Sequence, residues 1–193
     1  TAITVPHTFG IQYFSAFRRK AFIIRDYVNI EDYDISLDND DIKRKMGLDK
    51  YEFVMLYVAS LGQRGVTALK MLLSAIEMSP HKDRLCLLVV GRITREAMPL
   101  IDYVNLRKLN VIFTDYIPRG LKYFALFKIA DVGVFVLPCT DYAKFVSGMK
   151  LAEYIAAGLP VIAPSFPGPS DLIKDNGLTY NPCIESDLKD KLD

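Results

Sequence analysis

Most of the chain alternates between short apolar runs and segments in which apolar residues recur every three or four positions. The apolar runs, rich in branched side chains, cover residues 53–59, 85–90, 111–114, 132–137, 160–163 and 178–180. Helical spacing is found in other segments, at residues 42–46, 66–78, 96–108, 121–129, 147–157, 170–174 and 186–192. Near-continuous apolar strands between amphipathic helices predict an α/β fold, a Rossmann-like parallel sheet with helices on both faces.

The start of the chain follows a less regular pattern. Residues 2–6 and 21–24 are short and β-prone, and residues 11–20 have helical spacing with basic residues at the end. A polar run at residues 31–41 separates this part from the alternating strands and helices. We therefore expect two short strands and a helix ahead of the α/β unit.

The segment at residues 145–163, FVSGMKLAEYIAAGLPVIA, predicts a loop, a helix, a tight turn and a buried strand. Ser147 is a residue type that caps helix N-termini, and Gly158 suits the left-handed conformation that ends a helix. The free N–H groups and the dipole at the start of such a helix attract phosphate. Gly148 has no side chain to hinder the close approach of a phosphate to the backbone.

Two charged residues lie on one face of this predicted helix. Lys150, in the first turn, would place a positive charge near a bound phosphate, and Glu153, one turn deeper, would accept hydrogen bonds from a ribose diol. The same spacing also fits an exposed Lys–Glu pair on an ordinary surface helix, because such pairs are common and weak. The pattern alone leaves both interpretations open.

Composition and charge limit the partners and the compartment that we expect for the protein, but they do not indicate its function. A formal net charge of +1 gives no bulk attraction for nucleic acid or an acidic membrane, and no apolar run reaches the length of a transmembrane helix. The three cysteines, Cys86, Cys139 and Cys183, have no close spacing, so we expect no metal knuckle and no disulfide framework, which fits a reducing compartment. Cys86 lies in an apolar run and is expected to be buried. The chain begins with Thr, so we expect a fragment of a longer protein.

The segment at residues 145–163 resembles the nucleotide-sugar motif of the retaining GT-B glycosyltransferases known as group 1, or family 4. The residues that match this motif are Ser147, Lys150, Glu153, Tyr154, Ala156, Gly158, Pro160, Val161 and Ile162. Other members have an acidic residue eight positions before the helix glutamate, where this chain has Phe145. A non-catalytic nucleotide-binding module on the same fold therefore remains an alternative.

The resemblance implies that residues 29–193 form the C-terminal, donor-binding lobe of a two-lobed glycosyltransferase, with residues 1–28 as the end of the N-terminal lobe and the hinge. The implied reaction moves a sugar from a nucleotide-diphosphate sugar to an acceptor glycan, lipid or protein, with retention and without a metal or other cofactor. The acceptor would be held by the N-terminal lobe of the same chain, so we expect this part alone to be inactive. We expect a cytoplasmic protein, and peripheral contact with a membrane is left open.

Ligands of such sheets bind beyond the C-terminal ends of the strands, so the loops there supply further candidates. Arg64 lies where the family has a cation that reaches the donor diphosphate, whereas a second family arginine is replaced by Ser60. We therefore expect Lys150 and Arg64 to be the catalytic residues, which stabilise the diphosphate leaving group. Arg92 is a candidate for stacking on the base or meeting a phosphate.

The remaining donor-binding candidates come from two segments. Tyr116 and Ile117 precede a proline, in a turn where the backbone of the resembled family reads the edge of the base. The expected set is completed by residues in the motif segment, namely Ser147, Gly148, Met149, Leu151 and Glu153.

We expect no catalytic role for Asp131, His7 or His81. Asp131 begins a strand, at the end of the sheet away from the expected ligand, so we expect a structural role. A sugar-nucleotide 2-epimerase on the same fold is a second alternative, and it would need a histidine facing the sugar. Neither His7 nor His81 lies in a strand-end loop of the α/β unit.

Overall fold

The computed structural model describes residues 2–5, 10–11, 20–24 and 26–193. The strands are β1 (Ala2–Val5), β2 (Lys20–Ile23), β3 (Phe53–Val58), β4 (Leu85–Val90), β5 (Val111–Phe113), β6 (Val132–Val134), β7 (Val161–Pro164) and β8 (Gly177–Tyr180). The α-helices are α2 (Asn39–Lys45), α3 (Gln63–Met78), α4 (Met98–Arg107), α5 (Leu121–Ile129), α6 (Met149–Ala156), α7 (Pro167–Ile173) and α8 (Glu185–Asp190). The short 3-10 helices are η1 (Ile30–Tyr33), η2 (Arg95–Ala97) and η3 (Tyr142–Phe145). Most of the helix predicted at residues 11–20, and His7, lie outside the described residues.

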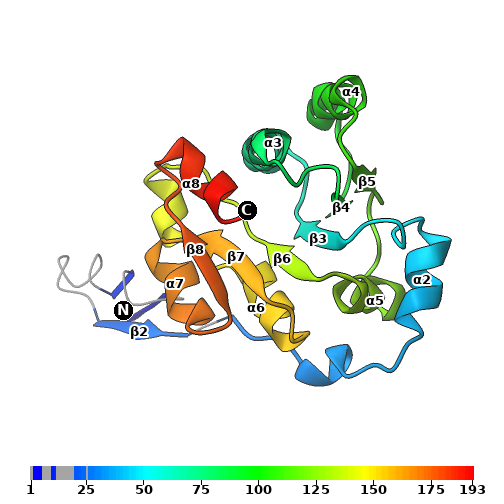
Figure 1. Cartoon of the computed structure of the whole chain (residues 1–193). Helices are drawn as coiled ribbons and strands as arrows, with labels where there is room; N and C mark the ends of the chain where they lie inside the picture. Colours follow the sequence, from blue (N-terminus) through cyan, green and yellow to red (C-terminus); the bar gives the residue numbers. More distant parts are fainter. Residues whose placement is uncertain (1, 6–9, 12–19, 25) are drawn as a thin grey trace.

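Six parallel strands form the main sheet, in the order β5-β4-β3-β6-β7-β8 (Figure 1). The chain enters at β3, builds outward to β5, then returns to the other side of β3 and builds outward to β8. This is the strand order of a Rossmann fold, so the predicted parallel α/β sheet is confirmed. The strand order reverses between β3 and β6. Strands β1 and β2 pair in parallel in a separate two-stranded sheet.

Alternate residues of the sheet pack against helices on its two faces. On β3, Met55 and Tyr57 lie in one buried cluster with residues of α3, α4 and α8, including Leu72. Val54 and Leu56 belong to the other cluster, with residues of α5, α6 and α7. Successive side chains of a strand point to opposite faces, so a strand that is apolar throughout must be covered on both. The apolar composition of β3 and β4 follows from this arrangement.

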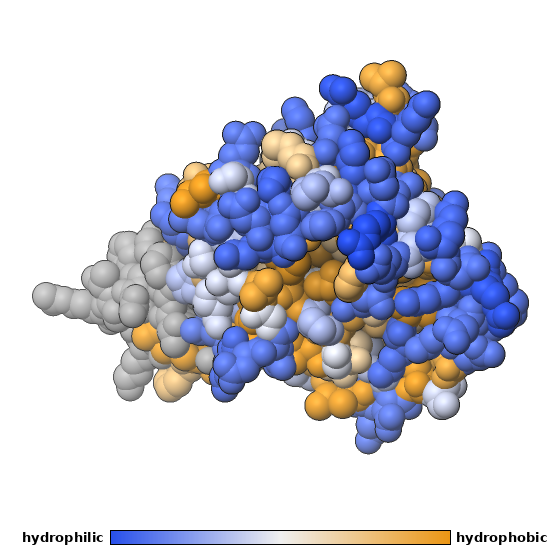
Figure 2. Space-filling view, in the orientation of Figure 1, coloured by the Kyte–Doolittle hydropathy of each residue, from blue (hydrophilic) through white to orange (hydrophobic). Residues whose placement is uncertain are grey.

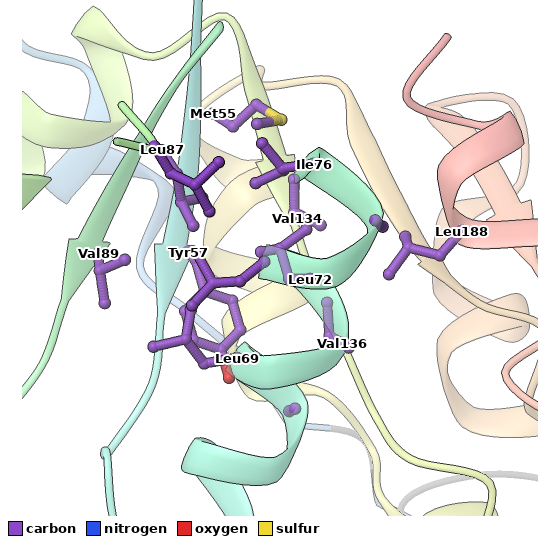
Figure 3. Close-up of a cluster of buried hydrophobic side chains, with 14 of the residues drawn as sticks. Met55, Tyr57, Leu69, Leu72, Ile76, Leu87, Val89, Val134, Val136 and Leu188 are labelled. Carbon is purple, nitrogen blue, oxygen red and sulfur yellow. The ribbon is translucent and has the colours of Figure 1, made fainter. Parts of the chain in front are cut away.

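Helix α3 buries one apolar stripe against the sheet. Figure 3 shows α3 lying over the sheet, with Leu69, Leu72 and Ile76 directed toward side chains of β3, β4 and β6, and Leu188 of α8 approaching the same cluster. The spacing of the three α3 residues is that of a single helix face. In Figure 2, hydrophilic atoms dominate the upper and right parts of the face drawn, whereas hydrophobic atoms gather in its middle and along its lower edge. None of the described helices is both long and apolar enough to cross a membrane.

Strands β3 and β6 separate soon after they pair. The last pair in their register is Leu56 with Gly133. Further along β3, the N–H of Val58 donates to the hydroxyl of Tyr154 on α6, with 2.9 Å between the two atoms. A buried N–H group needs a hydrogen-bond partner, so the Tyr154 hydroxyl lets the two strands part without leaving one unsatisfied.

The strand predicted at residues 132–137 is shorter in the structure, where β6 ends at Val134. The N–H of Phe135 still donates to a carbonyl of β7, at 2.8 Å. The N–H of Leu137 donates instead to the hydroxyl of Tyr180, at 3.1 Å. The partner of this N–H group is therefore a side chain and not a neighbouring strand. The apolar run in the sequence extends past the last residue of β6 for this reason.

A disulfide joins Cys139, after β6, to Cys183, after β8. The two residues are 44 positions apart in sequence, and their Cα atoms are 5.0 Å apart. The expectation of no disulfide was therefore wrong, because wide spacing in the sequence does not exclude proximity at the ends of a sheet. The cysteines therefore no longer support the expectation of a reducing compartment. Cys86 is free and buried, as expected, and burial raises the pKa of its thiol to about 11.

Asp131 has the structural role that its position predicts. Its carboxylate accepts the N–H of Val54 at 2.7 Å and lies 3.3 Å from the Nζ of Lys43. It therefore ties the start of β6 to the start of β3 and to α2, at the end of the sheet opposite the cavities described next.

Candidate functional site

Two cavities open at the C-terminal ends of the strands, where the strand order reverses. The first has a volume of about 640 Å³ and lies between the start of α3 and the segment that follows β6. The second has a volume of about 440 Å³ and lies among the segments that follow β3, β4 and β5. Val58, Ala59, Ser60 and Lys150 line both of them. The two cavities therefore adjoin, and Lys150 lies at their junction.

A close approach between two backbone segments shapes the first cavity. Gly65, in the first turn of α3, lies so near the preceding loop that a Cβ atom there would be 1.9 Å from the carbonyl oxygen of Ser60. Beside it, the guanidinium carbon of Arg64 lies 4.2 Å from the ring centroid of Tyr142 on η3. This cation–π contact joins the α3 wall to the η3 wall. The cavity thus presents a positive charge and an aromatic ring to a ligand.

The walls of the second cavity are fixed by Gly91 and Asp115. Gly91 has a φ of +152°, and a Cβ atom there would lie 1.7 Å from the carbonyl oxygen of Ala59. The carboxylate of Asp115 accepts the N–H of Ile93 at 2.8 Å. Hydrogen bonds from the N–H groups of Ile93 and Tyr116 hold the pKa of Asp115 below its usual value. The turn after β5 is therefore held against the turn after β4.

Three residues of these turns face the second cavity. The guanidinium carbon of Arg92 lies 5.5 Å from the ring centroid of Tyr116, whose side chain is exposed. Ile117 packs against the buried cluster beneath α5. All three line the cavity. An aromatic ring beside a guanidinium group suits a planar or anionic ligand.

A cluster of charged and hydroxyl side chains lies beside the junction of the cavities. The Nζ of Lys150 lies 2.8 Å from Glu153 Oε2 and 3.1 Å from the hydroxyl of Tyr123. Glu153 Oε2 also accepts the Tyr123 hydroxyl at 2.9 Å, and Oε1 accepts Nη1 of Arg119 at 2.5 Å. Arg119 extends outward to Asp32 of η1, at 3.2 Å. Both oxygens of Glu153 therefore have partners within the protein.

Glu153 is a buried charge that its partners keep ionised. Its side chain has no exposed surface, whereas the side chains of Lys150 and Arg119 are 36% and 48% exposed. Burial raises the pKa of Glu153, but the hydrogen bonds and charge of its partners, Lys150 first, outweigh burial and hold the pKa below its usual value. Burial and the charge of Glu153 raise the pKa of Tyr123, so its hydroxyl stays protonated and donates.

The structure brings part of the predicted set to the cavities. The predicted residues that line one or both of them are Lys150, Arg64, Arg92, Tyr116 and Ile117. The contact predicted between Glu153 and a ribose stays a prediction, and Glu153 lies beneath Lys150 rather than on a cavity wall.

The residues at the start of α6 lie elsewhere. Ser147 is not the helix cap, because Gly148 takes that position with a φ of +83°, and the Ser147 hydroxyl donates to the carboxylate of Asp26. Neither these residues nor Met149 lines either cavity. The side chain of Leu151 is fully buried, and its N–H donates to the carbonyl of Gly148 at 2.8 Å, so the donor contact expected of Leu151 stays a prediction. Gly158 does end the helix in the left-handed conformation, as predicted.

Sequence reasoning missed Arg119, Tyr123 and Tyr142. Arg119 and Tyr123 lie 34 and 30 positions before Glu153, too far for helical spacing to reveal the contact. Only Tyr123 could have been suspected from the sequence, because it places a hydroxyl group on a helix that is otherwise mostly apolar. Tyr142 lies on the short 3-10 helix η3, where the sequence has no periodicity that indicates which side chains face a cavity.

Cations and aromatic rings stand among the mostly apolar residues that line the joined cavities. Arg64 with Tyr142 lies on one side, Arg92 with Tyr116 lies on the other, and Lys150 lies between them. Such a lining suits an anionic ligand that also carries a planar ring. Across the described ranges, no group of three or more His, Cys, Asp or Glu side chains is placed to hold a metal ion.

Comparison with known proteins gives a family match over most of the chain. The model of the family described as "Glycosyl transferases group 1" matches residues 52–193. The matched part contains all six strands of the main sheet and the residues that line both cavities. No curated protein matches the chain in sequence.

Several solved structures share the fold at low sequence identity. The crystal structure of HepE from Anabaena in complex with UDP-glucose has a TM-score of 0.79 and 17% identity, and the match covers 98% of this chain and 52% of that one. A glycosyltransferase from Rickettsia africae has a TM-score of 0.79 and 18% identity, with 100% and 52% covered. WaaG, a glycosyltransferase involved in lipopolysaccharide biosynthesis, has a TM-score of 0.76 and 21% identity, with 98% and 52% covered. The chain thus spans about half the length of these proteins.

Proposed function

Because this chain belongs to the group 1 glycosyltransferases, we propose that it forms the donor-binding part of an enzyme that transfers a sugar from a nucleotide-diphosphate sugar to an acceptor. The observation that carries the proposal is the position of Lys150 at the junction of two adjoining cavities. A nucleotide-diphosphate sugar has two bulky ends joined by a charged middle, and the site has two cavities joined at a cation. The complex of HepE with UDP-glucose, on the same fold, supports this choice of ligand.

In this proposal each part of the donor has its own place. The nucleoside occupies the second cavity, where Tyr116 and Ile117 form the wall next to the base and Arg92 lies beside the base. The sugar occupies the larger first cavity. The diphosphate lies at Lys150, and Arg64 supplies a second cation from the α3 wall. Residues 29–193 then form the donor-binding lobe, with residues 1–28 as the end of an N-terminal lobe and the hinge.

The chemistry of this proposal is electrostatic. Transfer breaks the bond between the sugar and the diphosphate, so negative charge grows on the leaving phosphate oxygen. A cation that is already oriented stabilises this charge most effectively, because it need not be reorganised during the reaction. Lys150 meets this condition, since Glu153 and Tyr123 hold its Nζ before a ligand arrives. The proposal assigns this stabilisation to side chains and to no metal or other cofactor.

Two further features of the reaction rest on the family alone. We include retention of the anomeric configuration in the proposal, as a property of the retaining enzymes that the motif resembles. The acceptor, a glycan, lipid or protein, is held in this proposal by an N-terminal lobe of the longer protein.

Titration calorimetry of the chain with UDP, GDP and ADP tests the donor site. We expect at least one of the three to bind, and Lys150→Ala to weaken that binding by about tenfold or more, the loss of one hydrogen bond to a charged group. The remaining affinity should also depend less on salt, because one phosphate contact is gone. Lys70→Ala is the control, since Lys70 is exposed on α3 and lines neither cavity. Binding of none of the three nucleotides, or an equal loss in both variants, would contradict the proposal.

A non-catalytic nucleotide-binding module is the second candidate. It is favoured by Phe145, which stands where the resembled family has an acidic residue. Both candidates predict nucleotide binding, so the reaction itself must separate them. Release of nucleoside diphosphate from a nucleotide sugar by the full-length protein, measured with and without acceptor, would identify the enzyme.

A further inference from the structure

We propose that the disulfide between Cys139 and Cys183 is a reversible redox switch, and that its reduction by a dithiol weakens the binding of a nucleotide sugar. The bond acts on the wall of the first cavity, which is formed in part by residues 135–148, here called the β6–α6 segment. The inference rests on the proposed function, because that function assigns the sugar of the donor to this cavity. It gives a role to two cysteines for which the sequence predicts no bond.

The disulfide meets the wall of the first cavity directly. Cys139 lies between Pro138 and Thr140, which both line this cavity, and Tyr142 lines it further along the β6–α6 segment. Cys183 follows β8 and lines neither cavity. The structure describes the whole β6–α6 segment, and none of its residues lines the second cavity. A change at the disulfide therefore acts on the first cavity and leaves the walls of the second in place.

The hydrogen bonds in the middle of the β6–α6 segment are local. The N–H of Ala143 donates to the carbonyl of Thr140 at 3.1 Å, and the N–H of Val146 donates to the carbonyl of Ala143 at 3.2 Å. These bonds shape η3 without attaching it to the sheet. Nearer β6, the N–H of Leu137 donates to the hydroxyl of Tyr180 at 3.1 Å. Between that hydrogen bond and η3, the disulfide ties the segment to the end of β8.

Two non-covalent contacts of η3 would remain after reduction. The guanidinium of Arg64 stacks on the ring of Tyr142, which joins η3 to α3, and α7 also contacts η3. Both Arg64 and Tyr142 are exposed, and a cation–π contact at an exposed site is weak. We therefore expect reduction to loosen this wall locally and not to unfold the chain.

Both ends of the disulfide are open to a reductant. Cys139 and Cys183 are exposed and lie outside the helices and strands. Exchange requires a thiolate to reach one of the two sulfur atoms, and exposed disulfides are the labile ones that serve regulation. Cys86, the third cysteine of the chain, is fully buried on β4, so it does not exchange with this bond. The bond can therefore open and close while the sheet stays folded.

The reductant in this proposal is a dithiol. Its first thiolate attacks one sulfur of the Cys139–Cys183 bond, forms a mixed disulfide and releases the other cysteine as a thiolate, which takes up a proton. Its second thiolate then attacks the mixed disulfide, releases the remaining cysteine and closes the dithiol into a cyclic disulfide. Two electrons and two protons thus pass from the dithiol to the chain.

Hydrogen exchange measures the loosening without a ligand. The chain is purified without reductant, and one part of it is reduced with dithiothreitol, which is then removed under nitrogen. In the reduced chain, the amides of residues 139–147 should exchange faster, because the segment opens locally more often. The amides of β3 and β4 should keep their protection. Unchanged exchange at residues 139–147 would overturn the inference.

Paired ligands show whether the loosening reaches the site. UDP, GDP and ADP are each compared with their glucose conjugates by titration calorimetry of the oxidised and the reduced chain. For the base that binds, the dissociation constant of the nucleotide sugar should rise about tenfold on reduction, as when the binding-competent arrangement falls to about a tenth of the population. The dissociation constant of the diphosphate should stay close to its oxidised value, because this ligand needs only the second cavity and Lys150.

Cysteine variants provide the controls. Cys139→Ser and Cys183→Ser remove the bond, so each should bind the nucleotide sugar as the reduced wild type does, with or without dithiothreitol treatment. Cys86→Ala is the matched control, since Cys86 lies outside the bond, and it should respond to reduction as the wild type does. Reoxidation of the reduced wild type with oxidised glutathione should restore the tighter binding.

The outcomes separate this inference from the proposed function. An oxidised chain that binds none of the three diphosphates overturns the proposed function and this inference with it. Diphosphate binding with equal affinity for the nucleotide sugar in the oxidised and reduced chain overturns the inference alone. A reduced chain that loses its far-UV circular dichroism spectrum also overturns it, because the bond would then maintain the fold. If Cys139→Ser does not fold, Cys183→Ser and the reduced wild type carry the test.

Discussion

Lys150 owes its position to residues from separate parts of the chain. Glu153 lies one helical turn away, Tyr123 comes from α5, and Arg119 comes from the turn before α5. A lysine and a glutamate three positions apart on an exposed helix contribute little, because water solvates both. Here the carboxylate is fully buried. Removing one of its partners would therefore leave a poorly compensated charge, which is costly.

Acid should destabilise the chain in part through Glu153. In the folded chain its pKa lies below the ordinary value of 4.5, so the unfolded chain takes up the proton first as the pH falls. The stability that ionised Glu153 contributes is present above that value and is lost as the pH falls through the lower, folded-state pKa. We expect the free energy of unfolding, measured with urea at pH 7 and at a series of acid pH values, to fall more steeply in the wild type than in Glu153→Gln.

A surface carboxylate provides the control for this slope. Glu52 pairs with Arg84 at the surface, and that pair also holds the pKa of Glu52 below its usual value. Glu52→Gln should change the acid slope less, because solvent screens an exposed pair. An acid slope in Glu153→Gln that matches the wild type would show that the folded chain does not favour ionised Glu153.

At the scale of elements, β6 and α6 fit together through Gly133 and Tyr154. A Cβ atom at position 133 would lie 2.5 Å from the Cγ atom of Tyr154. The ring is not free to withdraw, since its hydroxyl accepts the N–H of Val58 where β3 and β6 part. We expect Gly133→Ala to lower the free energy of unfolding by about 1–3 kcal/mol, the usual cost of overpacking a core. Urea denaturation measures the change.

Gly62→Ala is the matched control for that substitution. A Cβ atom at Gly62 would meet nothing within 4 Å, and its φ of −74° suits any residue. Gly62 is the N-cap residue of α3, where alanine is less favourable than glycine, so the free energy of unfolding should fall by about 0.5 kcal/mol, less than for Gly133→Ala. Equal stability of the two variants would mean that the ring of Tyr154 can move aside at no cost.

The disulfide between Cys139 and Cys183 ties the segment after β6 to the segment after β8. The first of these segments also lines the larger cavity, through residues on either side of Cys139. Because the bond links residues 44 positions apart, its loss should lower the free energy of unfolding by about 2–4 kcal/mol. Urea denaturation of the wild type and of Cys139→Ser, without reductant, measures this loss.

A count of free thiols checks the same bond directly. Alkylation of the urea-unfolded chain without reductant should label Cys86 alone, and alkylation after reduction should label all three cysteines. Mass spectrometry distinguishes the two products. Three labelled cysteines before reduction would show that the disulfide is absent in solution.

The sequence predicts these elements well where burial leaves a simple pattern. Strands β3 and β4 are covered on both faces, so nearly every position is apolar and their bounds follow from composition. The pattern fails where a side chain replaces a backbone partner, as Tyr180 does at Leu137 beyond the end of β6. The residues of the site likewise differ in how far the sequence predicts them. Arg64 and Arg92 follow from their places after strands, whereas the role of Arg119 depends on a contact across 34 positions.

At the scale of the whole molecule, the chain spans about half the length of the solved structures that share its fold. The two cavities lie at one edge of a single sheet, and their walls come from segments that follow β3, β4, β5 and β6. Everything that the proposal requires for the donor is therefore present in one unit. The acceptor has no such assignment among the described residues, and the proposal gives it to an N-terminal lobe.

This division predicts that the chain alone binds a nucleoside diphosphate and transfers no sugar at a measurable rate. Transfer needs the acceptor held close to the sugar and water kept away, and a donor site by itself supplies neither condition. The test follows nucleoside diphosphate release from UDP-, GDP- and ADP-glucose by chromatography, with and without added glycans, alongside calorimetric binding. Lys150→Ala is measured in parallel, because it distinguishes release at this site from a contaminating activity. Release that needs the wild-type lysine would show that the chain alone holds a complete catalytic site, and the division into donor and acceptor lobes would then be wrong.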